Sequence, residues 1–131
     1  MAHQVMYDDD DPDLARVRGI ALALPGADVK VSHGRPAFFT KKIFTIYGAA
    51  VKEAGEWSQH SQSVLVLLEE DERAAMLTQP QSFVPAYWGP TGWIGIGLDD
   101  QTDWVEIAEL IESSYRNTAP AKIRASLDRS N

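Results

Sequence analysis

The residues of this chain that could do chemistry fall into two groups, and the first group is basic. Its members occupy one segment and are Lys30, His33, Arg35, Lys41 and Lys42. Cations in or beside turns can contact an anion or the phosphates of a nucleic acid, whereas lysines at a tight turn also protect a sheet edge from aggregation. The segment is therefore a candidate nucleic-acid or anion site, with edge protection as the alternative.

The second group is aromatic. Tyr87, Trp88 and Trp93 lie in or next to a loop that three prolines punctuate. Aromatic rings in such a loop can stack on bases or cover an apolar ligand. Similar rings also close a core over the edge of a sheet, so a packing role is the alternative to a ligand site.

Catalytic and metal chemistry have little support in the sequence. The chain has no cysteine, which excludes disulfides, thiolate nucleophiles and zinc–thiolate sites. Ser32 and His33 are adjacent and point to opposite sides of an extended chain, so they do not form a nucleophile–base pair. The acidic run at 8–11 with Asp13 lacks the spacing of a calcium loop and is typical of a solvated tail. We expect no enzyme activity, no metal and no cofactor.

Three glycines, Gly92, Gly95 and Gly97, also invite a functional interpretation. Their order, G-x-x-G-x-G inside a strand, differs from the dinucleotide fingerprint, which lies between a strand and a helix. We interpret Gly95 and Gly97 as positions where another backbone or an aromatic ring approaches the strand closely.

Length and charge limit the classes of protein that remain. A chain of 131 residues fits one domain, 1–131, in which we expect residues 1–10 to form a flexible acidic tail. The net charge of −7 opposes a phosphate backbone, although the basic residues cluster and leave room for a locally basic face. No apolar run approaches the ~20 residues that span a bilayer, and the N-terminus has no apolar signal region. We expect a cytoplasmic monomer without membrane association.

The elements that must position these residues follow from apolar periodicity. Asp11-Pro12 predicts the start of a helix over 12–24. The pattern then indicates a three-stranded meander over 29–48, a polar loop over 53–62 and a central strand over 64–68 that is buried on both faces. A short helix over 70–78, a strand over 92–98, a helix over 104–115 and a last helix from Pro120 complete the chain. This order predicts an α+β fold, an antiparallel sheet with helices packed on one face.

Short motifs spanning residues 14–124 occur in an order and spacing that can be compared with known families. They are Leu24-Pro25-Gly26, His33-Gly34 with Pro36-Ala37-Phe38, Lys41-Lys42-Ile43-Phe44, Gly92-Trp93-Ile94-Gly95-Ile96 with Leu98-Asp99, and Leu110-Ile111-Glu112-Ser113-Ser114-Tyr115. In these motifs the chain resembles the MmcQ/YjbR family of small bacterial proteins. The resemblance implies a CyaY/frataxin-like α+β fold and DNA binding, for which the basic meander is the candidate surface. The alternative is a small-ligand or protein-interaction domain that uses the aromatic loop 83–93 and has no nucleic-acid role.

Overall fold

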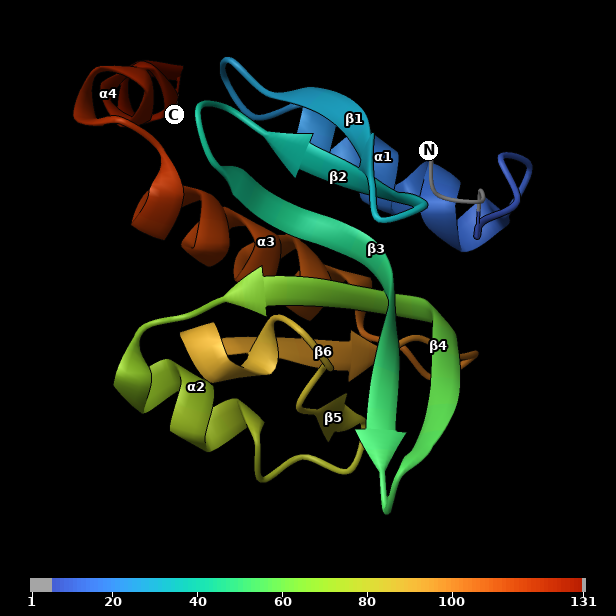
Figure 1. Ribbon diagram of the computed structural model, residues 1–131. Coiled ribbons are helices and arrows are strands. Elements are labelled where there is room, and N and C mark those ends of the chain that lie inside the picture. The colour runs from blue at the N-terminus through green and yellow to red at the C-terminus, as the bar shows by residue number, and fades with distance from the viewer. Residues whose placement is uncertain (1–5, 131) are drawn as a thin grey trace.

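A single six-stranded antiparallel sheet organises the protein. The computed structural model describes residues 6–130 (Figure 1). The elements, in chain order, are α1 (Pro12–Leu22), β1 (Asp28–Ser32), β2 (Arg35–Phe39), β3 (Ile43–Glu53), β4 (Glu56–Leu67), α2 (Glu70–Met76), β5 (Ser82–Phe83), the 3-10 helix η1 (Gly89–Thr91), β6 (Trp93–Gly97), α3 (Trp104–Thr118) and α4 (Ala121–Ser130). The strands lie in the order β1-β2-β3-β4-β6-β5. The predicted α+β fold is confirmed.

The main core lies between one face of the sheet and the helices α1 and α3 (Figure 1). Alternate residues of the strands point into it, and the predicted face of Ile94, Ile96 and Leu98 on and just after β6 is confirmed. Strand β4 is central, and its residues Val64 and Leu65 are fully buried on opposite faces, as predicted. A smaller cluster on the other face contains Ala37, Ile46, Ala49, Leu65 and Trp93.

The helix ends are determined locally. Asp11 caps α1 by accepting a hydrogen bond from the Asp13 backbone N–H (2.9 Å), and its second oxygen accepts from the Tyr47 hydroxyl (2.5 Å), which fastens the helix to β3. Asp103 caps α3 through the N–H groups of Val105 (3.0 Å) and Glu106 (3.2 Å). Both helix starts were predicted from the sequence and are confirmed.

The motif residues of α3 have structural roles. The buried Ser114 hydroxyl donates to the Phe44 carbonyl (2.5 Å) and accepts from the Leu67 N–H (2.8 Å), so it joins α3 to β3 and β4. The hydroxyl of Tyr115 donates to the Pro25 carbonyl (2.6 Å), which ties α3 to the end of the first helical segment. These contacts explain why motifs far apart in the chain belong together.

The polar segment 53–62 was predicted to be a loop, and this prediction is wrong. It forms a β-hairpin, in which Ala54 (φ 51°) and Gly55 (φ 82°) make the tight turn between β3 and β4. Beyond the part of β4 that pairs with β6, the hairpin projects from the sheet as a two-stranded ribbon (Figure 1). Its residues are mostly exposed, so the alternation of apolar and polar residues that marks a half-buried strand is missing.

The glycine interpretation of β6 is confirmed. A Cβ atom at Gly95 would overlap the ring of Phe83 in β5, and one at Gly97 would lie 3.5 Å from the Gln81 carbonyl. In the acidic segment before α1, the Met6 N–H donates to the Gly34 carbonyl (2.8 Å), and Asp9 pairs with Arg18 (2.7 Å). The remainder of the predicted tail, 1–5, lies outside the described residues.

Candidate functional site

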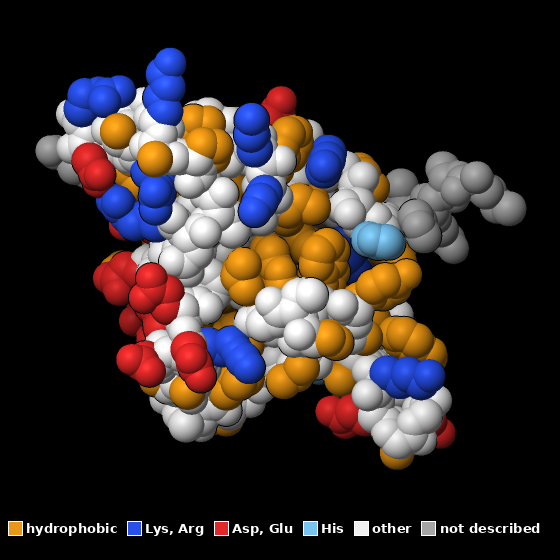
Figure 2. Space-filling model, turned by 60° about the vertical axis from the view of Figure 1, so that its left-hand side comes forward, with side chains coloured by type: hydrophobic (Ala, Val, Ile, Leu, Met, Phe, Trp, Pro, Cys, Tyr) orange, Lys and Arg blue, Asp and Glu red, His pale blue; other side chains and the backbone are white. Residues whose placement is uncertain are grey.

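A small pocket opens on the face of the sheet that α1 and α3 do not cover. It has a volume of about 230 Å³ and lies between the β1–β2 turn, the base of the β3–β4 hairpin and the aromatic loop before η1. Figure 2 shows this face, on which hydrophobic side chains gather around a central hollow. The apolar floor comes from Ile46 and Ala49, and the rim includes Trp57, Tyr87 and Trp88.

Arg35 supplies the charge of the pocket. It begins β2, and only 6% of its surface is exposed. Its Nη2 group donates to Gln59 Oε1 (2.5 Å) and its Nη1 group to the Met6 carbonyl (3.4 Å), both of which are neutral acceptors. No carboxylate of residues 6–130 forms an ion pair with it, and burial lowers the pKa of its guanidinium.

A bulge in β3 makes room for this side chain. The pairing of β3 with β4 shifts between Tyr47 and Ala49, and Gly48 lies at the shift with a φ of +87°. A Cβ atom at Gly48 would overlap Arg35 Nη1, so the guanidinium lies against bare backbone. Bulges often occur beside functional sites, where they redirect a side chain. Here the bulge lets the long side chain of Arg35 lie flat against the face of the sheet.

His33 and the strained Tyr87 meet at the rim. His33 (φ 52°) takes its left-handed backbone from the two-residue β1–β2 hairpin turn that it forms with Gly34 (φ 81°). Tyr87 (φ 75°) lies outside any hairpin, and positive φ is rare for a residue of its size. The ring centroids of His33 and Tyr87 are 5.0 Å apart, and the ring of Trp88 lies 6.1 Å from that of His33. The loop is fastened to β3 by a hydrogen bond from the Ala86 N–H to the Ala50 carbonyl (2.8 Å). Such strain clusters at functional sites, where the surrounding structure enforces it.

The pocket joins residues that the sequence assigned to two competing sites. His33 and Arg35 come from the basic group, and Tyr87 and Trp88 from the aromatic group. Trp93 does not line the pocket; it is buried below Trp88, with ring centroids 5.6 Å apart, and belongs to the smaller core cluster. Its role is to support the ring above it.

The remaining basic candidates lie elsewhere. Lys41 and Lys42 are exposed in the β2–β3 turn, and Lys30 lies on β1 with its Nζ atom 4.8 Å from the ring centroid of Phe39. Lys41 and Lys42 lie apart from His33, because antiparallel pairing places the β1–β2 turn and the β2–β3 turn at opposite ends of β2.

Sequence reasoning missed other pocket residues. Trp57 and Gln59 line the pocket but occur in the segment that was predicted to be a loop. Gly48 interrupts a run of β-branched and aromatic residues, and a glycine within a strand is a signal of a bulge or of close approach. Of the missed residues, only Gly48 could have been recognised from the sequence.

A basic band borders the pocket face. In Figure 2, Lys and Arg side chains line the upper part of this face, over β1, the β2–β3 turn and α4, while acidic side chains gather over α2. We define the basic band as Lys30, Lys41, Lys42, Lys122, Arg124 and Arg129. Within the described part of the chain, Lys30, Lys41 and Lys42 form no ion pair.

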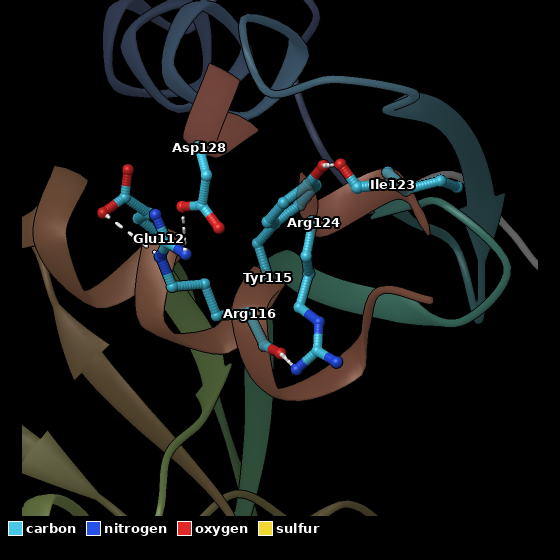
Figure 3. A network of polar contacts seen from close by, with 6 residues as sticks. All are labelled: Glu112, Tyr115, Arg116, Ile123, Arg124 and Asp128. Carbon is cyan, nitrogen blue, oxygen red and sulfur yellow. Dashed lines mark hydrogen bonds and ion pairs between the residues drawn. The ribbon is translucent and has the colours of Figure 1, made fainter. Parts of the chain in front are cut away.

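The neighbouring Arg116 is neutralised. Figure 3 shows it at the junction of α3 and α4, where its side chain lies between Glu112 (3.8 Å) and Asp128 (3.0 Å). The hydrogen bond to Asp128 raises the pKa of Arg116. Arg124 donates to the Arg116 carbonyl (3.2 Å), which holds its guanidinium near the helix junction. Arg116 is therefore a structural cation and not part of the basic band.

No group of three or more His, Cys, Asp or Glu side chains among residues 6–130 is placed to hold a metal ion. His60 stacks on Phe83, with ring centroids 4.5 Å apart. In the same part of the chain, no helix combines the length and apolar character needed to cross a bilayer.

The fold and the site define an α+β domain with an antiparallel sheet, helices over one face and a small cationic, aromatic pocket on the other. The family model YjbR matches residues 22–117, and the chain belongs to the YjbR family. No curated protein matches the chain. The match to the family model confirms the family resemblance found in the sequence.

Proposed function

We propose that this protein is a non-catalytic small-molecule-binding domain whose site is the pocket around Arg35. One observation carries the proposal: the fold buries an arginine without a carboxylate partner at the base of an apolar, aromatic pocket. Burying an unpaired charge is unfavourable. Binding sites are commonly concave and apolar, with a few polar groups that orient the ligand, and this pocket has that composition.

The strain at the rim supports the same proposal. A core that only needed to be closed would not require positive φ at Tyr87, which lies outside any hairpin turn. Tyr87 is also 76% exposed, so its ring gains little by burial in the protein alone. An aromatic side chain held in this way can cover a bound ligand.

The test is a nuclear magnetic resonance titration of the full chain with benzamide, a small neutral aromatic compound. The four tryptophans report on different places. We expect shifts of the indole N–H signals of Trp57 and Trp88, which line the pocket, and none for Trp104 on the other face of the sheet. Uniform shifts, or none, would argue against the pocket as the site.

A pair of variants controls for nonspecific effects. Ala86→Leu adds volume inside the pocket, whereas Ala108→Leu adds the same volume to a half-buried alanine of α3. Binding should weaken in the first variant and persist in the second, with thermal melting used to verify that both fold. Equal affinities would contradict the proposal.

Nucleic-acid binding through the basic band is the second candidate. Its support is the gathering of Lys and Arg side chains on one part of an otherwise acidic molecule, as Figure 2 shows. Arg35 would not contribute, because it is buried in the pocket. Contacts from Lys30, Lys41 and Lys42 to three phosphates should produce a slope of about −2.7 in a plot of log affinity against log salt for duplex DNA.

Fluorescence anisotropy with a labelled DNA duplex across a salt series tests this candidate. The double variant Lys41→Glu/Lys42→Glu should abolish binding. The double variant Lys52→Glu/Arg73→Glu changes the charge by the same amount, but its residues lie on the β3–β4 hairpin and α2, and it should bind DNA about as the unaltered protein does. Equal loss in both variants would indicate only nonspecific attraction.

A further inference from the structure

We propose that the ligand of the pocket is a small carboxylate with an apolar body, and that its carboxylate is held by Arg35. This inference rests on the proposed small-molecule-binding function and specifies the chemical class of the ligand. It starts from the hydrogen-bond partners of the guanidinium. Arg35 is a buried cation whose partners among residues 6–130 are an amide oxygen and a backbone carbonyl.

The hydrogen-bonding capacity of the guanidinium exceeds these two partners. A guanidinium has five N–H donors in a planar fork, and the bonds to Gln59 and Met6 use two of them. The fork matches the two oxygens of a carboxylate, and hydrogen bonds between two charged groups are among the strongest in proteins. A carboxylate would therefore supply both the missing countercharge and the missing acceptors.

The lining of the pocket specifies the rest of the ligand. Its floor is apolar at Ile46 and Ala49, and aromatic rings border it. Such a surface favours a flat hydrocarbon body over a sugar or another polyhydroxylated group, which would lose hydrogen bonds to water without replacement. The charged end and the apolar surroundings together select an amphipathic anion.

Size and charge limit the candidates further. A volume of about 230 Å³ is below the range of pockets for drug-sized ligands. A phosphate carrying about two negative charges would meet one buried arginine, while the lysines of the basic band lie outside the pocket. The geometry therefore favours a single carboxylate over a phosphate.

Three probes of similar size and different charge test the inference: benzoate, benzamide and benzylamine. We expect benzoate to bind the full chain about ten- to a hundredfold more tightly than benzamide, and benzylamine to bind most weakly. The affinities are obtained from the indole N–H shifts of Trp57 and Trp88, and the Arg35 side-chain N–H signal should move with benzoate. Equal affinity of benzoate and benzamide would overturn the inference.

Variants show which cation produces the preference for benzoate over benzamide. Arg35→Gln should reduce the affinity for benzoate to that for benzamide, and Arg35→Lys should restore part of the difference. Arg124→Gln removes an exposed arginine of α4 and should change nothing. If Arg35→Gln does not fold, the preference of the unaltered protein for benzoate and the shift of the Arg35 signal decide the question.

The outcomes separate the two proposals. Binding of benzamide in the pocket without a preference for benzoate would leave the small-molecule function intact and refute the carboxylate inference. Absence of binding by all three probes, even at high concentration, would refute both. A preference for benzoate that survives Arg35→Gln would refute the role of Arg35.

Discussion

At the scale of single residues, the pocket depends on the contact between Arg35 and the backbone of Gly48. The glycine serves two purposes: it adopts a φ of +87°, and it leaves the space that the guanidinium occupies. Any side chain at this position would meet Arg35 Nη1 and, at 3.2 Å, the Ser61 carbonyl. Packing thus joins Arg35, a charged residue, to Gly48, a residue without a side chain.

We predict that Gly48→Ala destabilises the protein more than Gly55→Ala does. Both glycines have positive φ, +87° and +82°, but a Cβ atom at Gly55 would meet nothing within 4 Å. The left-handed conformation costs an alanine about 1–2 kcal/mol at either site, and the overlap with Arg35 should add at least about 1 kcal/mol at Gly48. Urea denaturation measures the difference.

The double variant Arg35→Ala/Gly48→Ala tests the cause. Because Arg35→Ala removes the atoms with which the new Cβ would collide, the two changes should cost less together than the sum of the single changes. Strict additivity would show that the destabilisation comes from the backbone alone.

The two buried tyrosines predict how stability depends on pH. Burial, with the hydrogen bond to Asp11, raises the pKa of Tyr47, and burial raises the pKa of Tyr115. The unfolded tyrosines ionise near pH 10, so their contribution to stability is complete below that pH and is lost as pH rises above it. Above pH 10 each should add a slope of up to about 1.4 kcal/mol per pH unit to the fall in unfolding free energy.

Urea denaturation between pH 9 and 11 tests this prediction. Tyr47→Phe and Tyr115→Phe should each make the decline less steep, whereas Tyr87→Phe changes an exposed hydroxyl and should not. A slope that is the same in all three variants would show that these hydroxyls do not control alkaline unfolding.

At the scale of elements, the aromatic loop and β6 work as one unit. Trp93 on β6 is 7% exposed and supports Trp88, and Phe83 of β5 covers Gly95. The loop therefore rests on rings that belong to the smaller core cluster. Buried rings therefore support the pocket rim, although Tyr87 itself is exposed.

The loss of stability on replacing a tryptophan should increase with the burial of its ring. Trp93→Ala should cost about 3–5 kcal/mol, because it removes a buried ring from under the loop. Trp57 is 58% exposed, and Trp57→Ala should cost less than about 1 kcal/mol. Chemical denaturation of both variants gives the comparison, and a larger loss for Trp57 would contradict the packing described.

Trp104 should fall between these two. Its position at the start of the apolar stripe of α3 suggests a core residue, but the structure leaves it half-buried, with the Arg16 guanidinium 5.0 Å from its ring centroid. Arg16 and Ile20 of α1 cover only part of the ring. We therefore expect a loss smaller than that for Trp93→Ala.

At the scale of the whole molecule, the core extends beyond the segment that matches the family model. That segment, 22–117, omits nearly all of α1 and the whole of α4. Leu14 and Val17 of α1 are fully buried in the main core, and Leu127 of α4 is 7% exposed. Both helices therefore contribute buried side chains to the main core.

The isolated fragment 22–117 should therefore fail to fold cooperatively. Without α1 and α4 it would expose the apolar surface that Leu14, Val17 and Leu127 cover, and a domain's total stability is only about 5–15 kcal/mol. Circular dichroism during thermal melting provides the measurement. A cooperative transition within a few degrees of that of the full chain would show that the helices are dispensable.

The sequence by itself determined the features that depend on neighbouring residues. Asp11 and Asp103 cap helices through the N–H groups that follow them, and alternation along 92–98 shows which side of the strand faces the main core. The order of these elements was sufficient for the α+β class and the family. The hairpin at 53–62 was missed because cross-strand pairing, and not burial, stabilises its exposed strands.

Only the tertiary structure decided the site. Arg35, Gly48, Gln59 and Tyr87 come from four separate segments, and no local pattern indicates that they converge. Arg35 looks like an exposed turn cation in the sequence, yet the bulge at Gly48 buries it. Antiparallel pairing also separates it from Lys41 and Lys42, since the two turns lie at opposite ends of β2. Whether a charge is buried or solvated depends on what packs around it, and that is a property of the assembled sheet.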